Sequence, residues 1–212
     1  IIGVGLIGGS IGMAVRQRKL SEKVVGIGRR QGSLDKAKRL GAIDSASTSI
    51  AQGVADADLV VVCTPVEHIV GHVKEVAASC TAECIITDAG STKQAIVESM
   101  DSCDARFVGS HALAGSEKTG CEHGDADLFV DRVCVVTPTR RTPKADDESI
   151  DQFWSAIGMR VARMSPTEHD SALASTSHLP HVVAAALATA TPKKYLELVA
   201  GGWLDTTRIA AA

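Results

Sequence analysis

The stretch Gly3-Val4-Gly5-Leu6-Ile7-Gly8 fits the pattern G-x-G-x-x-G and follows an apolar, strand-like run at the start of the chain. In such a turn the first glycine permits the tight bend, the second lets the backbone approach a pyrophosphate, and the third lets the next helix pack closely on the strand. The phosphates then lie at the N-terminus of that helix. Glycines also cluster in turns for packing reasons alone, but the position between a strand and a helix favours the binding interpretation. We therefore predict that Gly3, Gly5, Leu6, Ile7 and Gly8 bind a dinucleotide.

Outward from this turn, short apolar runs rich in β-branched residues alternate with stretches that have helical spacing. The expected strands are Ile1–Val4, Val24–Ile27, Leu59–Val62, Cys84–Thr87, Arg106–Gly109, Val133–Val136 and Arg160–Met164. The expected helices are Ile7–Leu20, Leu34–Leu40, Val66–Ala78, Thr92–Met100 and Asp146–Ile157. Strands that are apolar on both faces, each followed by a helix, indicate a mostly parallel sheet covered on both sides. The sequence thus predicts an α/β fold of the Rossmann type, doubly wound.

The character of the chain changes after residue 164. Ser165-Pro166-Thr167-Glu168 combines an N-cap serine, a proline at the first helical position and a glutamate at the third, which is a capping box that opens a helix of about 25 residues. Pro180 should kink this helix and free carbonyl groups near Thr176 and Ser177. A short helix after Pro192 should then lead to Gly201-Gly202. We therefore expect a dinucleotide-binding domain over 1–164 and an all-helical domain over 165–212.

Both ends of the chain lack the usual boundaries of a domain. The chain starts abruptly inside an apolar run, and it stops in Ile209-Ala210-Ala211-Ala212 without a helix cap. We expect the first strand to be cut at its start and the helical domain to be partial.

The residues after the second expected strand bear on the choice of dinucleotide. An NAD site usually places an acidic residue there to bind the ribose hydroxyls, whereas this chain has Gly28-Arg29-Arg30. Two guanidinium groups can grip a phosphate with paired hydrogen bonds, so Arg29 and Arg30 favour NADP over NAD. The alternative is that both arginines merely solvate a loop.

Three further segments carry candidate catalytic groups. Ser91 follows the strand Cys84–Thr87, at the edge where open α/β sheets bind ligands. An alternative is that Ser91 and Gln94 form an S-x-x-Q capping box for the next helix. His111 also follows a strand; because small residues and glycines surround it, it is not a core histidine, and it suits the role of the base that a dehydrogenase needs.

The third segment contains His178, His181 and Arg208. The two histidines are three residues apart in the expected helix and so share a face, and Arg208 is suited to clamp a carboxylate. A metal site is an alternative for this histidine pair, but no acidic or cysteine ligand lies near it. For His68 and His72, a solvated helix face is preferred to a metal site. We predict no metal.

Taken together, these segments resemble the prephenate/arogenate dehydrogenase family of tyrosine biosynthesis, in the right order and over nearly the whole chain. The motifs that carry the resemblance are Gly3–Ser10, Asp88–Lys93, Ser110-His111 with Ala114-Gly115-Ser116-Glu117, Ser177-His178-Leu179-Pro180-His181 and Asp205–Ala210. The family couples hydride transfer to a nicotinamide with loss of carbon dioxide from a ring that becomes aromatic. The resemblance implies a homodimer formed through the helical domain, and prephenate, arogenate or both as substrate.

The resemblance also implies a role for each candidate. His111 would accept the proton of the ring hydroxyl, and Ser91 would hold that hydroxyl, His111 and the nicotinamide in line. Arg208 would bind a substrate carboxylate, with His178 and His181 near the substrate. Thr64 and Pro65 would border the dinucleotide.

The chain departs from the family pattern at two places. The family often reads His-Pro-Met at its catalytic histidine, where this chain has His111-Ala112-Leu113. The family often has a basic residue within Phe-Arg-Asp, where this chain has Trp203-Leu204-Asp205. The second departure removes a cation near the expected carboxylate site.

Composition excludes several other functions. The 212 residues are 45% hydrophobic and 22% charged with a formal charge of −3, so no basic field attracts nucleic acid or anionic lipid. No apolar run has the length of a membrane span, and six irregularly spaced cysteines indicate a reducing compartment, by default the cytoplasm. Two other functions fit the motifs: a dehydrogenase or reductase of another small carboxylated compound, and a dinucleotide sensor without catalysis.

Overall fold

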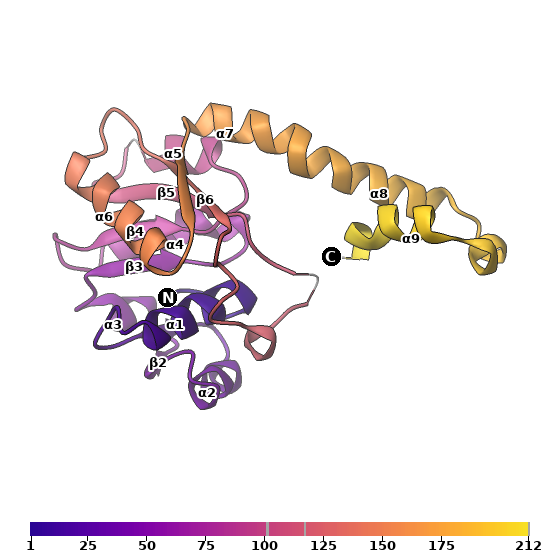
Figure 1. The fold of residues 1–212 in the computed structure, drawn as a ribbon. Coiled ribbons are helices and arrows are strands. Elements are labelled where there is room, and N and C mark those ends of the chain that lie inside the picture. The colour runs from indigo at the N-terminus through magenta and orange to yellow at the C-terminus, as the bar shows by residue number, and fades with distance from the viewer. Residues whose placement is uncertain (101, 117, 212) are drawn as a thin grey trace.

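The computed structural model describes residues 1–100, 102–116 and 118–211, which form an α/β body and a long helical arm that extends from it (Figure 1). The body comprises the sheet and the helices around it, from α1 to β7. The arm begins at α7 and carries the end of the chain back along its own length (Figure 1). The predicted fold class, a mostly parallel Rossmann-type sheet followed by a helical part, is confirmed.

The sheet contains two hydrogen-bonded groups of strands in the orders β1-β2 and β3-β4-β5-β6-β7. Ile2 joins them, because it forms parallel bridges both to Ile27 in β1 and to Val62 in β3. All strand pairs are parallel except β5 with β6, which is antiparallel. The strands are β1 (Val25–Ile27), β2 (Ser45–Ser47), β3 (Leu59–Val62), β4 (Ile85–Asp88), β5 (Phe107–Ala112), β6 (Val133–Thr137) and β7 (Arg160–Arg163).

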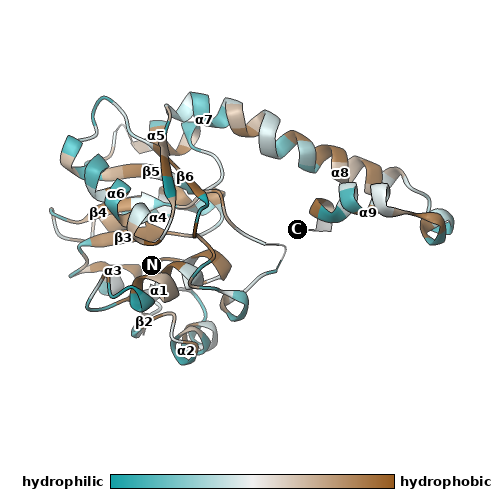
Figure 2. Ribbon diagram, in the orientation of Figure 1, coloured by the Kyte–Doolittle hydropathy of each residue, from teal (hydrophilic) through white to brown (hydrophobic). Residues whose placement is uncertain are grey.

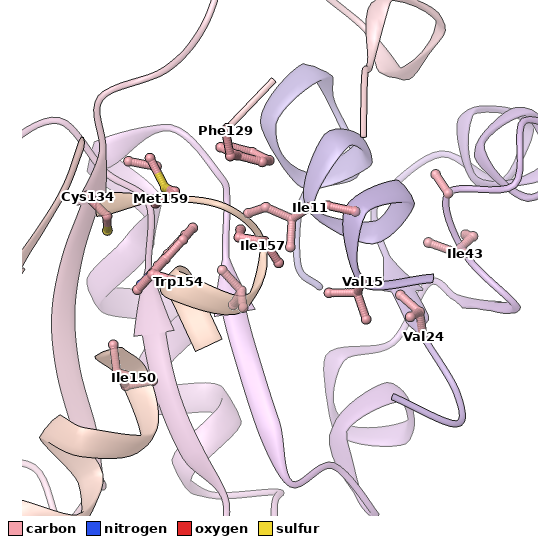
Figure 3. Close-up of a cluster of buried hydrophobic side chains, with 14 of the residues drawn as sticks. Ile11, Val15, Val24, Ile43, Phe129, Cys134, Ile150, Trp154, Ile157 and Met159 are labelled. Carbon is pink, nitrogen blue, oxygen red and sulfur yellow. The ribbon is translucent and has the colours of Figure 1, made fainter. Parts of the chain in front are cut away.

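Helices cover both faces of the sheet. Neighbouring residues of a strand point to opposite faces, and accordingly Val61 of β3 packs in one hydrophobic cluster while Val60 and Val62 pack in the other. The first cluster includes Ile11 and the fully buried Trp154 (Figure 3). The helices of the body are α1 (Leu6–Gln17), α2 (Gln31–Arg39), α3 (Ile50–Val54), α4 (Val66–Ala77), α5 (Gln94–Met100), the 3₁₀ turn η1 (Cys121–His123) and α6 (Lys144–Ala156).

The arm begins with the predicted capping box. The Ser165 side chain accepts a hydrogen bond from the Glu168 N–H, and the Glu168 carboxylate accepts one from the Ser165 N–H. Helix then continues from Pro166 to Ala190 through α7 (Pro166–Leu173), a π-helical turn (Ala174–His178) and α8 (Leu179–Ala190). The π turn lies just before Pro180, where the ring removes a donor, and the His181 ring donates a hydrogen bond to the carbonyl of Ser177.

After α8 the chain turns through η3 (Lys193–Leu198) into α9 (Gly201–Thr207) and a last turn, η4 (Arg208–Ala211). Much of α8 is apolar (Figure 2). Several large apolar side chains on the arm are exposed: Leu179, Val182, Val183, Leu187, Leu196, Leu198 and Leu204. None of the helices in the described part of the chain has the length and apolar character needed to cross a membrane.

One expectation about an element is wrong, and two elements were not expected. The strand Ile1–Val4 is reduced to the bridge at Ile2, because the tight turn begins at Gly3, whose φ is +87°. The short helix expected after Pro192 is confirmed as η3, and the glycine pair Gly201-Gly202 that follows it begins helix α9. Strand β2 and helix α3 are additions that we did not expect.

Candidate active site

The glycine-rich turn has the shape that a dinucleotide phosphate requires. A Cβ on Gly8 would collide with the carbonyl oxygen of Gly3, and a Cβ on Gly3 would lie 2.8 Å from the carbonyl oxygen of Cys63. By contrast, a Cβ on Gly5 would meet nothing within 4 Å. Gly5 is the N-cap of α1, which has neither a side-chain cap nor an acidic residue in its first turn. The first N–H groups of α1, at Leu6, Ile7 and Gly8, have no partner within the helix, so the start of α1 is suited to bind an anion.

The remaining predicted dinucleotide contacts lie at the same edge of the sheet. Thr64 follows β3 and lies beside the turn, since its Cγ2 would be 3.0 Å from a Cβ on Gly3. Its hydroxyl pairs with Nδ1 of His72 at 2.9 Å, and Pro65 is the N-cap of α4. Arg29 and Arg30 follow β1 and are both exposed. Because His72 pairs with Thr64, it is only partly exposed, whereas His68 is exposed. The prediction that both histidines lie on a solvated helix face is therefore confirmed for His68 alone.

The segment after β4 is anchored by Asp88, which is fully buried. One carboxylate oxygen accepts the N–H of Ser110 at 3.0 Å, and the other accepts the N–H of Gly90 at 2.9 Å and pairs with the buried ammonium group of Lys93. Ser91 lies on this loop and is exposed. The carboxylate of Asp88 thus fixes the loop of Ser91 relative to the strand that carries His111.

The proposed capping box between Ser91 and Gln94 is wrong. The N–H groups of Lys93 and Gln94, at the start of α5, donate to the two carboxylate oxygens of Asp170 at 2.8 and 3.0 Å. The Gln94 amide donates to Glu98 instead of reaching back. A residue of α7 therefore caps α5, and Ser91 is left without this structural role.

His111 lies on β5 with its ring against the ring of His169 from α7. Their centroids are 5.1 Å apart in an edge-to-face arrangement, and Nδ1 of His111 lies 2.9 Å from Nε2 of His169. His169 is fully buried, and its Nδ1 lies 2.7 Å from a carboxylate oxygen of Asp170. The three side chains form a continuous chain of hydrogen bonds between the arm and the body.

The surroundings of His111 keep its ring neutral. Burial lowers the pKa of His111 to about 3, and the neighbouring His169, Lys93 and His178 act in the same direction. Our expectation that little bulk surrounds His111 is therefore wrong, because His169 comes from a distant part of the chain. A neutral imidazole at physiological pH is the form that accepts a proton.

Comparison with known proteins identifies the family. Residues 11–163 match the family model described as prephenate dehydrogenase, nucleotide-binding domain, and residues 165–212 match the one described as prephenate dehydrogenase, dimerization domain. The chain belongs to the prephenate dehydrogenase family.

Individual relatives agree with this assignment. The chain is 36% identical over 222 residues to prephenate dehydrogenase of Bacillus subtilis (strain 168), with all of this chain and 60% of the relative covered. It is 34% identical over 221 residues to cyclohexadienyl dehydrogenase of Zymomonas mobilis, with all of this chain and 75% of the relative covered. The crystal structure of Aquifex aeolicus prephenate dehydrogenase in complex with hydroxyphenyl propionate and NAD+ superimposes with a TM-score of 0.91 at 32% identity, covering all of this chain and 77% of that one.

Within this prephenate dehydrogenase family member, the predicted substrate residues come from the arm. His178 ends the π turn, is partly buried, and lies close enough to His111 to lower its pKa. His181 is exposed and its ring bonds to its own helix, while Arg208 is exposed at the end of α9. The structure therefore brings His178 to His111, and gives neither His181 nor Arg208 a contact with it. Glu117 lies outside the described residues, and the described residues contain no group of three side chains suited to hold a metal.

Sequence reasoning missed four functional candidates: Asp88, Lys93, His169 and Asp170. Asp88 and Lys93 stood inside a motif from which we singled out Ser91 alone. The available signal was an aspartate at the end of an apolar strand-like run with a lysine five residues later, because open α/β sheets bind ligands at that edge. His169 and Asp170 carried no local signal, since both fit an ordinary polar position in the first turns of a helix.

Proposed function

We propose that this protein oxidises and decarboxylates prephenate, arogenate or both, with transfer of a hydride to NAD(P)+. The observation that carries the proposal is a neutral histidine, His111, at the sheet edge that also bears the glycine-rich turn. The matching relatives are named as dehydrogenases of this kind, and the chain covers 60% of the length of the B. subtilis protein and 75% of the Z. mobilis protein.

His111 acts as the base in this proposal. The substrate hydroxyl gives its proton to Nε2 of His111, because Nδ1 is engaged by His169. The C–H bonding pair of the same ring carbon leaves as a hydride, and the bond from the ring to its carboxylate breaks as carbon dioxide departs. NAD(P)+, when bound, supplies the hydride acceptor. Aromatisation of the ring provides much of the driving force, so the orientation of the base matters more than its strength.

The other site residues position the substrate. Ser91, exposed on the loop that Asp88 fixes, is assigned to the ring hydroxyl. His178, beside His111, is assigned to the substrate side chain, with His181 one turn further along the arm. Arg208 is the cation for a substrate carboxylate, which an always-charged guanidinium binds with paired hydrogen bonds. Arg208 begins η4, where the chain has turned back along α8 (Figure 1), which supports this assignment.

The cofactor side of the site is assigned to Gly3, Gly5, Leu6, Ile7 and Gly8 at the phosphates, with Thr64 and Pro65 alongside. We favour NADP over NAD because Arg29 and Arg30 follow β1 and no carboxylate stands in their place. The support is that both arginines are exposed just after β1, whose last residue, Ile27, accepts the N–H of Gly3 in the glycine-rich turn.

The division of the chain and its assembly are part of the proposal. We place the boundary between 164 and 165, which is supported by the end of β7 at Arg163 and by the two family models that meet there. The exposed apolar side chains of α8 support a homodimer formed through the arm, as does the description of the matching domain model. All six cysteines are free thiols, which supports the cytoplasm as the location.

The decisive experiment measures reduction of NAD+ and NADP+ by fluorescence in the whole protein, with prephenate and arogenate in turn. Turnover with at least one substrate is expected, and His111→Asn should abolish nearly all of it while leaving dinucleotide binding intact. Dinucleotide binding without turnover of either substrate would overturn the assigned reaction. Full activity of His111→Asn would overturn the role of the base.

A further inference from the structure

His169 is the most deeply buried histidine in the described part of the chain, and the proposed reaction gives it no role. It lies on α7, 58 residues from His111, and both its ring nitrogens are engaged: Nε2 with His111 and Nδ1 with Asp170. Burying a second imidazole against the base costs desolvation, which its two hydrogen bonds offset. The hydrogen bonds of His169 therefore determine which ring nitrogen of His111 carries the proton.

The direction follows from Asp170, whose carboxylate only accepts hydrogen bonds when ionised. Burial acts to raise the pKa of Asp170, but the hydrogen bonds from His169 and from the N–H groups of Gln94 and Lys93 outweigh it and lower the pKa. The Nδ1 atom of His169 must then carry the proton and donate to Asp170. A neutral His169 ring has its lone pair on Nε2, where it accepts from Nδ1 of His111. His111 is thereby left with its lone pair on Nε2.

The position of Asp170 is itself fixed by the body. Its two oxygens accept from the first two N–H groups around the start of α5, so the carboxylate also complements the positive end of that helix. The start of α5 is directly joined to the loop of Ser91 and to Lys93, whose ammonium group pairs with Asp88. The relay from Asp170 through His169 to His111 therefore ties the arm to both segments that bear the proposed catalytic groups.

We propose that His169 and Asp170, through their hydrogen-bonded chain to His111, hold that ring with its Nδ1 protonated and its Nε2 unprotonated, which makes them positioning residues for the proposed reaction. The inference rests on the proposed function for its catalytic consequence, but the tautomer of His111 is independent of any substrate. When His111 takes a proton, the same chain spreads the positive charge toward Asp170. The relay thus selects the form of His111 whose Nε2 can accept the substrate proton. The carboxylate of Asp170 favours the positive charge that then forms on His111, while burial and the His169 ring oppose it.

The first test observes the tautomer directly. ¹⁵N NMR of the ring nitrogens in the whole protein, at neutral pH and without substrate, should show His111 with a protonated Nδ1 and an unprotonated Nε2. In His169→Leu the acceptor is lost, and the ring should shift toward the form with a protonated Nε2. A protonated Nε2 in the unmodified protein overturns the proposal, as does an unchanged tautomer in His169→Leu. Because no substrate is needed, this result stands even if the protein acts on a different compound.

The second test separates positioning from folding. His169→Leu should lower kcat at least tenfold, with little change in KM or in dinucleotide affinity. The loss should not exceed the whole contribution of a general base, which is about 10²–10⁴-fold. His169→Gln places an amide oxygen where Nε2 of His169 accepts, so it should recover most of kcat. The matched control is His123→Leu, which removes an exposed imidazole in η1 and should leave kcat unchanged.

Two outcomes would contradict the kinetic half of the proposal. Equal losses in His169→Leu and His169→Gln would show that packing, and not the acceptor atom, is what matters. A loss expressed only in KM would assign His169 to substrate binding. If His169→Leu does not fold, His169→Gln and the NMR spectrum of the unmodified protein still decide the question.

Discussion

The ammonium group of Lys93 pairs with the carboxylate of Asp88, and neither side chain is exposed. The pair lies between the loop of Ser91 and the strand of His111, because Asp88 also accepts the N–H groups of Gly90 and Ser110. Lys93 contributes to the lowered pKa of His111 by its charge. One buried ion pair therefore fixes the relative position of the two predicted catalytic segments, and its lysine adds to the effect of burial that keeps His111 neutral.

Removal of one partner of this pair should be strongly destabilising. Lys93→Met leaves the carboxylate of Asp88 buried and uncompensated, so we expect the free energy of unfolding to fall by about 3–5 kcal/mol. Urea denaturation followed by circular dichroism measures the change. The double variant Asp88→Asn with Lys93→Met removes the orphaned charge and should recover part of the loss. Lys144→Met, at a lysine that is 89% exposed, is the control and should change stability by at most about 0.5 kcal/mol. A loss below about 1 kcal/mol in Lys93→Met would contradict the burial of the pair.

Two glycines of the turn should respond to alanine in opposite ways. A Cβ at Gly5 meets nothing within 4 Å, so Gly5→Ala should leave stability nearly unchanged while it obstructs the approach of the pyrophosphate and weakens dinucleotide binding at least tenfold. A Cβ at Gly8 collides with the backbone of Gly3, so Gly8→Ala should lower the melting temperature by several degrees. Thermal unfolding and dinucleotide fluorescence titration measure the two effects. Unweakened binding in Gly5→Ala would rule out the assigned phosphate site.

The parts of the fold that could be predicted are those with local signals. The strand Leu59–Val62 is confirmed residue for residue, because four consecutive apolar β-formers between polar neighbours fit a strand buried on both faces. The capping box at Ser165 is confirmed because its four residues determine their own hydrogen bonds. Strand β2 was missed because Ser45-Ala46-Ser47 lacks a large or β-branched side chain, and its partner β1 alone makes it a strand.

In the site too, the features with a local signal could be predicted and those that depend on distant residues could not. The glycine turn and the irregular helix before Pro180, which is a π turn, could be predicted because backbone geometry there depends on the residue itself. The environment of His111 could not, because His169 and Asp170 reach it from 58 and 59 residues further along the chain. Nor could the sequence show that the carboxylate of Asp170 caps α5, because Ser91 and Gln94 already fitted the pattern of a local capping box.

The pH dependence of stability should carry the signature of His111. Its pKa is lowered from an ordinary 6.5 to about 3 by burial first and by its charged neighbours, so below pH 6.5 the unfolded chain binds a proton that the folded chain does not. The stabilisation is therefore fully present above pH 6.5 and is lost as the pH falls toward 3. Between pH 7.5 and pH 5 this group should account for about 2 kcal/mol of lost stability.

His111→Asn isolates this contribution, because asparagine does not titrate. The difference in free energy of unfolding between the unmodified protein and His111→Asn, measured by urea denaturation at several pH values, should change by about 2 kcal/mol over that interval. A difference that stays constant with pH would mean that the ring is protonated in the folded protein at an ordinary pKa, and the proposed base would then be charged below pH 6.5.

The choice of dinucleotide depends on the two arginines that follow β1. Arg29 and Arg30 are exposed just after β1, and a hydrogen bond to a charged group contributes about 1.5–3 kcal/mol. Replacing both by alanine should therefore weaken NADP binding by about 10- to 100-fold or more, while NAD affinity changes by less than about threefold. Fluorescence titration of both dinucleotides at fixed ionic strength measures the ratio.

Arg39→Ala provides the matched control, because Arg39 is another exposed arginine, at the last residue of α2, the helix that follows Arg30. This substitution removes one positive charge, as each of the other two does, but Arg39 lies away from the end of β1. It should therefore leave the ratio of NADP to NAD affinity unchanged. Higher salt should weaken NADP binding more than NAD binding in the unmodified protein and should lose this difference in the double variant. If both dinucleotides weaken equally in the double variant, the arginines act as a general positive field, and the preference for NADP is wrong.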